Sequence, residues 1–392
     1  MNRHRISLLI SLFMVTFLIN GCASLIYKSI PLKDVAKTSG KYFVGTQNFQ
    51  LVDSTRSMWF TDDIKSFRTL SVKMWYPADE NSLSERAPYV DQYELIAKAL
   101  STSLGVPEAL MSRAGAVKCN SWLNTDISIG NFPIVIYSHG HQSLKIANTF
   151  QAEEIASNGY IVIAPDHTYD AALTIINEDK IIYTRSKLPN SDEEAEDSEM
   201  IKRVKEQLNI RVEDISFVID KMIEKFSKDK KFNQSADFEN IGIFGHSFGG
   251  CTAIMAANND NRIDAILGLD AYFLPLPNYI IDKDINKPFV HLGQTSWGDS
   301  NNYELMKIWG SNNSQNSFHF SVEGSKHNDF TDFSQFTKLT RKFGSGKVPR
   351  KIMRNIMNDV MLQFFNYHLK SIDNFDANQF ENKYKRVKTY VH

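Results

Sequence analysis

The chain lacks features that define several protein classes. Cysteine is scarce, since 392 residues contain only Cys22, Cys119 and Cys251, and these cannot build a disulfide framework. An excess of one charge is also missing, because 44 Lys and Arg residues face 45 Asp and Glu residues, giving a formal net charge of −1. Nucleic-acid binding needs a basic surface, so we do not expect it.

A metal site is not expected either. The ten histidines are scattered and show no zinc-type spacing with cysteine or carboxylate ligands, so we predict neither a metal nor another cofactor. The chain is rich in apolar residues. Its 42% hydrophobic and 12% aromatic residues indicate a globular protein with a large core. The length allows two domains, although α/β enzymes often use it for one.

The N-terminal segment is interpreted as a targeting signal. Basic residues at positions 3 to 5 precede an apolar run from Ile6 to Ile19. This pattern is typical of a signal peptide. The run is shorter than the roughly 20 residues that cross a bilayer, so a permanent transmembrane anchor is the weaker alternative.

The stretch Leu18-Ile19-Asn20-Gly21-Cys22 resembles a bacterial lipobox, in which the cysteine thiol receives a diacylglycerol. The resemblance implies a mature chain that starts at Cys22 and is held on an envelope membrane by lipid chains. Ala23 follows instead of an aspartate, which in a Gram-negative bacterium favours the outer membrane.

Short apolar runs alternate with helical patterns over most of the remaining chain. The run at 70–76 alternates like a half-buried strand, and a strong helical pattern covers 201–226. Six further runs look like strands buried on both faces: 133–137, 160–164, 241–244, 265–269, 288–292 and 318–322. This order predicts an α/β protein with a mostly parallel central sheet flanked by helices.

One motif indicates nucleophilic chemistry. Gly245-His246-Ser247-Phe248-Gly249-Gly250 follows the strand at 241–244 and precedes a small-residue helix at 251–258. A serine on such a tight strand-to-helix turn projects its hydroxyl, and glycines on both sides avoid collisions with the neighbouring backbone. The motif predicts that Ser247 is a catalytic nucleophile.

A serine nucleophile requires a histidine base and an acid that orients it. In α/β-hydrolases both follow the serine in the chain. Among the downstream histidines, His291 and His319 lie in strand patterns, and His368 and His392 lie in the C-terminal helix and tail. His327 follows a late strand in a loop, so we predict it to be the base.

Two aspartates remain candidates for the acid on these grounds. Asp270 ends the strand directly after the elbow helix, whereas Asp299 follows the next strand, at the commoner α/β-hydrolase position. Either carboxylate is compatible with the order of the chain.

Three blocks of sequence together resemble the plasma-type platelet-activating factor acetylhydrolases, α/β-hydrolases of the dienelactone-hydrolase-like set. They are the serine motif, the block 269–276 that begins Leu269-Asp270-Ala271-Tyr272, and the block 327–333 that begins His327-Asn328-Asp329. The resemblance implies that Asp270 is the acid. It also implies that Ser138-His139-Gly140 belongs to the oxyanion-hole loop.

The resemblance implies a serine carboxylic-ester hydrolase that forms an acyl-enzyme and cleaves short or oxidised acyl esters of phospholipid-like substrates. The backbone N–H groups of Phe248 and His141 are the expected oxyanion-hole donors. Phe273, Leu274 and Leu276 follow the acid and are expected to line the substrate cleft.

Two alternatives stay open at this level: a general esterase acting on polymer or xenobiotic esters, and a non-catalytic envelope lipoprotein on a hydrolase fold. The expected organisation is a signal peptide at 1–21, an anchor-proximal linker at 22–45 and a single α/β-hydrolase domain at 46–392. The sequence leaves the oligomeric state open.

Overall fold

The computed structural model describes residues 34–60, 66–104, 117–177, 180–189, 198–297, 301–313, 317–372 and 374–391. The predicted signal peptide, Cys22 and Asp299 lie outside these ranges. The chain divides into two compact units, one of Ala36–Ala87 with Asn120–His392, the other of the described parts of Met1–Val35 and Pro88–Cys119. No helix in the described ranges is both long enough and apolar enough to cross a membrane.

The fold is organised around an 11-stranded sheet in the order β13-β12-β11-β10-β9-β5-β6-β2-β1-β4-β3, and β7 and β8 form a separate hairpin. The strands are β1 (Phe43–Ser57), β2 (Phe67–Ala78), β3 (Arg86–Pro88), β4 (Lys118–Leu123), β5 (Phe132–Ser138), β6 (Ile161–Asp166), β7 (Leu173–Asn177), β8 (Lys180–Tyr183), β9 (Ala236–His246), β10 (Ile263–Leu269), β11 (Phe289–Gly293), β12 (Ser317–Val322) and β13 (Val387–Val391). The six central strands, in the sheet order β12-β11-β10-β9-β5-β6, pair in parallel. At either end of this group, β2 pairs antiparallel with β6 and β13 pairs antiparallel with β12.

Helices connect the strands. They are α2 (Tyr93–Leu104), α4 (Thr149–Ser157), α6 (Ser198–Ser227), α7 (Lys230–Ser235), α8 (Phe248–Asn259), α9 (Asn278–Ile281), α10 (Asn302–Asn312), α11 (Phe333–Phe336), α12 (Arg350–Lys370) and α13 (Asn378–Lys383). The described residues also include the short 3-10 helices η1 (Glu80–Ser82), η3 (His327–Phe330) and η4 (Lys338–Phe343).

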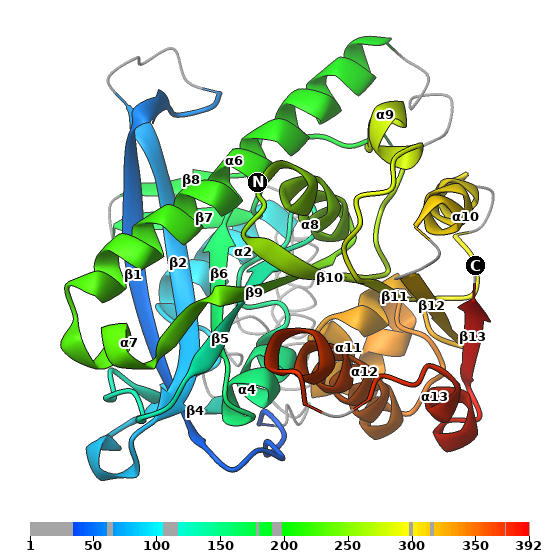
Figure 1. The fold of residues 1–392 in the computed structure, drawn as a ribbon. Coiled ribbons are helices and arrows are strands. Elements are labelled where there is room, and N and C mark those ends of the chain that lie inside the picture. Colours follow the sequence, from blue (N-terminus) through cyan, green and yellow to red (C-terminus); the bar gives the residue numbers. More distant parts are fainter. Residues whose placement is uncertain are drawn as a thin grey trace, which may run out of the picture. The chain divides into compact units, whose positions relative to one another are not determined.

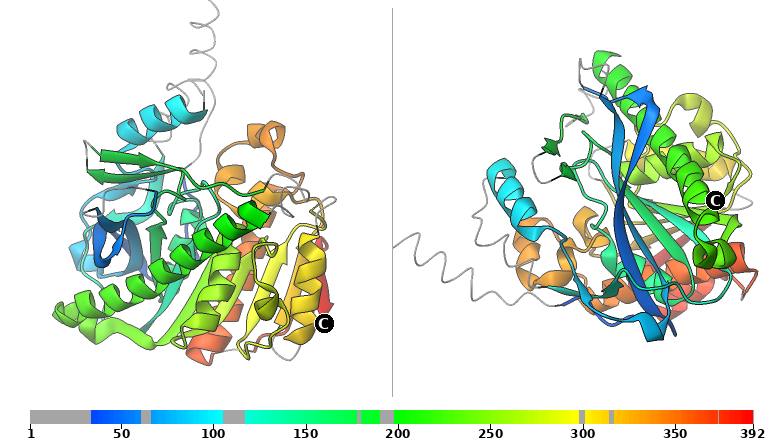
Figure 2. Two further views of the ribbon diagram at one scale, coloured as in Figure 1. Left: turned by 90° about the horizontal axis from the view of Figure 1, so that it is seen from above. Right: turned by 90° about the vertical axis from the view of Figure 1, so that its left-hand side faces the viewer.

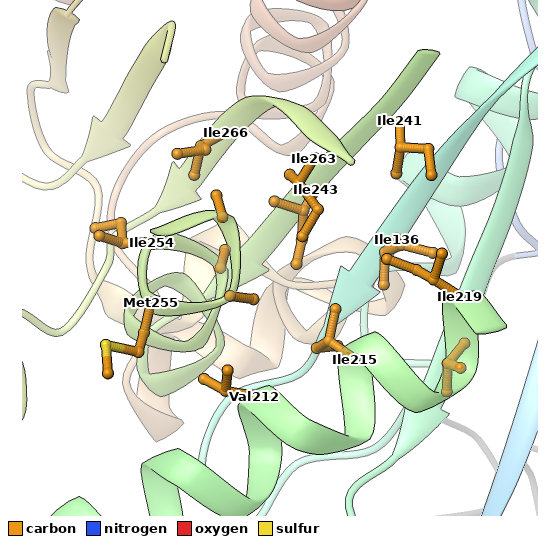
Figure 3. Packing of buried hydrophobic residues seen from close by; sticks show 14 of the residues in the cluster. Ile136, Val212, Ile215, Ile219, Ile241, Ile243, Ile254, Met255, Ile263 and Ile266 are labelled. Atoms are coloured by element: carbon orange, nitrogen blue, oxygen red, sulfur yellow. The ribbon is translucent and has the colours of Figure 1, made fainter. Parts of the chain in front are cut away.

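Helices lie on both faces of the sheet (Figure 1), and each face of the described part of the sheet is covered by a cluster of buried hydrophobic residues. On one face α6 and α8 pack on the central strands, and Figure 3 shows Ile215 and Ile219 of α6 beside Ile136 of β5. On the other face the core contains α4 and α12. Figure 2 shows α6 crossing its face of the sheet in two further views.

The predicted fold class is confirmed. Each of the six predicted buried strands is present, and the predicted helix at 201–226 lies inside α6. The 15-residue β1 was not predicted, because much of its length is exposed on one side and carries no continuous apolar run. It pairs antiparallel with β2, which contains the predicted strand at 70–76.

Candidate active site

The turn between β9 and α8 has the geometry of a nucleophile elbow. Ser247 joins the two elements with φ 55° and ψ −119°, in the region that L-residues rarely occupy. A Cβ atom at Gly245 would lie 2.1 Å from the Gly249 carbonyl oxygen, and one at Gly249 would lie 1.9 Å from the Ser138 carbonyl oxygen. The two glycines are therefore required by close backbone approach, as the sequence indicated.

The elbow is bonded to the neighbouring strand. The Ser247 N–H donates to the Leu269 carbonyl at 3.0 Å, and the Ser247 carbonyl accepts from the Tyr272 N–H at 3.0 Å. Leu269 and Tyr272 flank Asp270, so the candidate nucleophile and the candidate acid lie on adjacent, hydrogen-bonded turns. Ser247 is 8% exposed.

The structure brings the predicted acid and base together. Asp270 follows β10 and His327 begins η3, after β12. The His327 Nδ1 atom lies 2.6 Å from Asp270 Oδ2, and the Asp270 side chain is fully buried, while that of His327 is 34% exposed. The competing acid of the sequence analysis, Asp299, lies outside the described residues.

Asp270 is surrounded by further donors that sequence reasoning did not identify. Gln294 donates through its backbone N–H at 3.0 Å and its side-chain amide at 2.9 Å. Trp297 Nε1 lies at 3.2 Å and the Tyr303 hydroxyl at 2.6 Å. Burial alone would raise the pKa of Asp270, but the interactions with His327 and Tyr303 hold that pKa well below its usual range. The carboxylate therefore stays ionised and can hold the imidazole.

The other downstream histidines occupy the elements expected of them. His291 lies in β11, His319 in β12 and His368 in α12, whereas His392 is outside the described residues. His291 has a structural contact, because its Nε2 atom accepts the Ala271 N–H at 3.0 Å. His327 is thus the histidine that the structure places against Asp270.

Three hydrogen bonds fix the loop that carries His327. His246 Nε2 lies 3.2 Å from the His327 carbonyl oxygen. Burial lowers the pKa of His246 to about 3, so this ring is neutral at physiological pH and its Nε2–H must donate to the carbonyl. At the far end of the loop, the Asn148 amide donates to the Phe330 carbonyl at 2.9 Å, and the Asp332 N–H donates to the Ala147 carbonyl at 2.8 Å.

The predicted oxyanion-hole loop follows β5. The carbonyl of Gly140 accepts the Ser143 N–H at 3.1 Å and His139 Nδ1 at 2.7 Å. In a trans peptide the N–H points opposite to the carbonyl, so these bonds also fix the direction of the His141 N–H. The Phe248 N–H belongs to the first residue of α8, where helix amides have no intrahelical acceptor. The rings of His141 and Phe248 meet edge to face with centroids 6.5 Å apart.

The three predicted cleft residues differ in exposure. Phe273 and Leu276 are buried in the hydrophobic core, with Phe273 against the rings of Phe289 and Trp309. Leu274 is half-buried. Core packing therefore accounts for Phe273 and Leu276, and of the three only Leu274 keeps access to solvent.

Trp297 is an aromatic candidate that the sequence did not single out. It is partly exposed, stacks on Tyr272 with ring planes 5° apart, and meets the His327 ring edge to face with centroids 4.9 Å apart. It therefore flanks the base. Over the residues that the structure describes, no cluster of three or more His, Cys, Asp or Glu side chains is arranged to hold a metal ion.

Comparisons with known proteins show which family the chain belongs to. The family model for platelet-activating factor acetylhydrolase, isoform II, matches residues 27–389. The platelet-activating factor acetylhydrolase of Canis lupus familiaris is 25% identical over 89% of this chain and 81% of its own length. The enzyme of the same name from Gallus gallus is 24% identical over 78% of this chain and 79% of its own.

A solved structure gives the same fold. The ferulic acid esterase from Streptomyces cinnamoneus superposes with a TM-score of 0.71 at 23% identity, over 91% of this chain and 99% of that one. The fold is therefore that of an α/β-hydrolase. Because the family model spans nearly the whole chain, the protein belongs to the platelet-activating factor acetylhydrolase family and is a carboxylic-ester hydrolase.

Proposed function

We propose that Ser247, His327 and Asp270 are the nucleophile, base and acid of a serine esterase. The observation that carries this proposal is the 2.6 Å contact between His327 Nδ1 and the buried Asp270 carboxylate, beside a serine held at φ 55° on a strand-to-helix turn. The contact fixes the tautomer of His327, with its proton on Nδ1 and the free lone pair on Nε2.

The reaction runs in two steps. His327 Nε2 takes the Ser247 hydroxyl proton as Oγ attacks the ester carbonyl, and the imidazolium then gives that proton to the leaving alcohol. Water then hydrolyses the acyl-enzyme. His327 takes a proton from the water as its oxygen attacks the acyl carbonyl, and gives that proton to Ser247 Oγ as the carboxylic acid is released. The negative charge on the carbonyl oxygen in each step is stabilised by the N–H groups of Phe248 and His141.

The names of the relatives and an aromatic side chain beside the proposed base support one substrate class. The canine and chicken relatives are named as acetylhydrolases of platelet-activating factor. Trp297 offers apolar surface next to the His327 ring. We infer that the enzyme cleaves short or oxidised acyl chains from phospholipid-like esters.

Labelling with a fluorophosphonate probe tests the triad, because it reports an activated serine independently of substrate. The full chain in detergent micelles is expected to label, and Ser247→Ala to lose both labelling and p-nitrophenyl acetate hydrolysis. Ser227→Ala, at the exposed end of α6, is the control and is expected to behave as wild type. Activity that persists in Ser247→Ala would contradict the proposal.

A series of p-nitrophenyl esters from acetate to palmitate tests the substrate class. We expect kcat/KM to fall steeply beyond butyrate or hexanoate, and phospholipids with a short sn-2 chain to be hydrolysed without calcium. A preference for palmitate, or hydrolysis of aryl esters with no turnover of such phospholipids, would favour the general-esterase alternative.

We also propose that Cys22 carries a lipid that holds the enzyme on the cell envelope, on the outer membrane if the host is Gram-negative. The near-zero net charge offers no other general attraction to an anionic surface. Radiolabelled palmitate is expected to enter the wild-type chain and not Cys22→Ala, which would then leave the membrane fraction. Membrane retention of Cys22→Ala would point instead to an uncleaved transmembrane segment.

A further inference from the structure

A buried arginine lies behind the active site, and the catalytic steps above do not use it. Arg211 comes from the middle of α6 and is 1% exposed. Its Nη1 atom donates to Asp170 Oδ1 at 3.3 Å. Its Nη2 atom donates to Ser138 Oγ at 3.1 Å and also to the His139 carbonyl oxygen.

The same guanidinium reaches the elbow. Its central carbon lies 4.7 Å from the centre of the Phe248 ring, close enough for a cation–π contact. Arg211 therefore contacts both segments that supply the expected oxyanion donors, the loop that begins at Ser138 and the first residue of α8.

A directional chain of hydrogen bonds continues from Ser138 into the interior. Ser138 Oγ lies 3.1 Å from His167 Nε2, and His167 Nδ1 lies 3.0 Å from Asp214 Oδ2. The carboxylate of Asp214 is neutralised by Arg68, whose Nε and Nη2 atoms donate to it at 3.0 and 2.5 Å. Because the Asp214 carboxylate can only accept, the neutral His167 ring carries its proton on Nδ1, and its Nε2 atom accepts the Ser138 hydroxyl proton.

Ser138, His167 and Asp214 thus repeat the order of a catalytic triad inside the protein. All three are essentially inaccessible, with exposures of 0%, so no ester carbonyl reaches Ser138. A second catalytic centre is excluded on that ground. These hydrogen bonds can only fix the positions of the three side chains and of the groups bonded to them.

The bonds around the loop show what is held. His167 N–H donates to His139 Nε2 at 3.0 Å, which leaves the proton of the His139 ring on Nδ1, the atom that donates to the Gly140 carbonyl. The Gln142 N–H donates to the carbonyl of Asp170, the residue whose carboxylate pairs with Arg211. Both sides of the Gly140–His141 peptide are therefore tied to groups that contact Arg211 or His167.

We propose that Arg211, acting with the buried chain of Ser138, His167 and Asp214, is a positioning residue that preorganises the oxyanion hole. It fixes the direction of the His141 N–H through the loop at 138–143 and the location of Phe248 through its ring. This inference rests on the proposed triad mechanism, because an oxyanion forms only in that reaction.

The test compares Arg211→Lys with Arg262→Lys in the full chain. Lysine keeps the charge but cannot bond to Ser138, His139 and Asp170 together. Arg262 is also paired with two carboxylates, those of Asp220 and Asp260, but has no contact with the loop at 138–143. The measurements are kcat, KM, Tm and the Ki of a trifluoromethyl ketone, which mimics the oxyanion.

We expect Arg211→Lys to lower kcat by about 10- to 100-fold, less than the roughly 100- to 1,000-fold loss when an oxyanion donor is removed outright, with KM changed less than about threefold. The Ki of the ketone should rise by the same factor as kcat/KM falls, and Arg262→Lys should match wild type. If Arg211→Lys does not fold, Ser138→Ala serves as the second variant, because it removes the hydroxyl that links Arg211 to His167. The same parallel change in kcat and Ki is expected.

Unchanged kcat and Ki in a variant with a lowered Tm would show that the network only stabilises the fold, and would overturn the inference. A wild-type chain that neither labels with fluorophosphonate nor hydrolyses esters would instead contradict the proposed function. The two failures are therefore distinguishable.

Discussion

Acid should destabilise this protein well before its carboxylates titrate. Burial lowers the pKa of His246 to about 3 and that of His167 to about 4, against 6.5 for an exposed histidine. Both rings are fully buried, so the folded chain keeps them neutral while the unfolded chain protonates them. The free energy of unfolding is therefore not reduced by these histidines above pH 6.5. It falls as the pH drops from 6.5 toward 4, because the unfolded chain binds protons that the folded chain does not.

The magnitude follows from the pKa differences. At pH 5 each unfolded histidine has gained almost a full proton, worth about 2 kcal/mol, so the two rings together lower the free energy of unfolding by about 4 kcal/mol relative to pH 7.5. Burial also lowers the pKa of His139, which acts in the same direction. The depressed carboxyls of Asp214 and Asp270 contribute nothing in this interval, because they are ionised in both states above pH 5.

Urea unfolding of the full chain at several pH values between 7.5 and 5.0 measures this loss. The total stability of most domains is about 5–15 kcal/mol, so the urea midpoint should fall markedly. His167→Gln removes one of the titrating groups and should reduce the pH slope by roughly one proton, even if the variant is less stable overall. A free energy of unfolding that stays constant from pH 7.5 to 5.0 would refute the assignment of these histidines as buried and neutral.

Two further substitutions probe the elbow and the acid. Gly249→Ala places a Cβ 1.9 Å from the Ser138 carbonyl oxygen, so the loop at 138–143 must move, and kcat should fall by about 100-fold or more; near-wild-type kcat would show that the loop is not constrained there. Tyr303→Phe removes the donor at 2.6 Å from Asp270 and should destabilise the fold by about 1.5–3 kcal/mol, measured by urea unfolding. Because Gln294 and Trp297 still bond to the carboxylate, kcat should fall less than about tenfold, and a larger fall would mean that Tyr303 has a direct part in the reaction.

The sequence predicted what depends on local pattern. Buried strands and the elbow could be predicted because an apolar run or a pair of nearby glycines is a pattern of only a few residues. The order of the strands then determines which turns lie side by side. The contact of Asp270 with His327 spans 57 residues, and it was anticipated only through the resemblance to a family. From the chain alone, Asp270 and Asp299 could not be separated.

The buried polar contacts were not predictable in this way. Gln207, Arg211 and Asp214 recur at helical spacing in α6 beside its apolar stripe, a pattern that normally indicates a solvent-facing side. Their burial depends on partners such as Ser138 and Asp170, which lie far away in the sequence. Phe273 differs in the opposite direction. Its place shortly after Asp270 suggested a wall of the substrate cleft, but its ring is buried in the hydrophobic core.

Two hydrogen bonds join the loop that carries His327 to the segment just before α4, those between Asn148 and Phe330 and between Asp332 and Ala147, and they bear on when the site is completed during folding. Asn148 and Phe330 are 182 residues apart, so we expect their bond to form after the strands between them have joined the sheet. Contacts of such high sequence separation form late, because loop-closure entropy must be overcome first. We therefore expect His327 to reach its place late in folding, so that a partly folded chain would lack the proposed base.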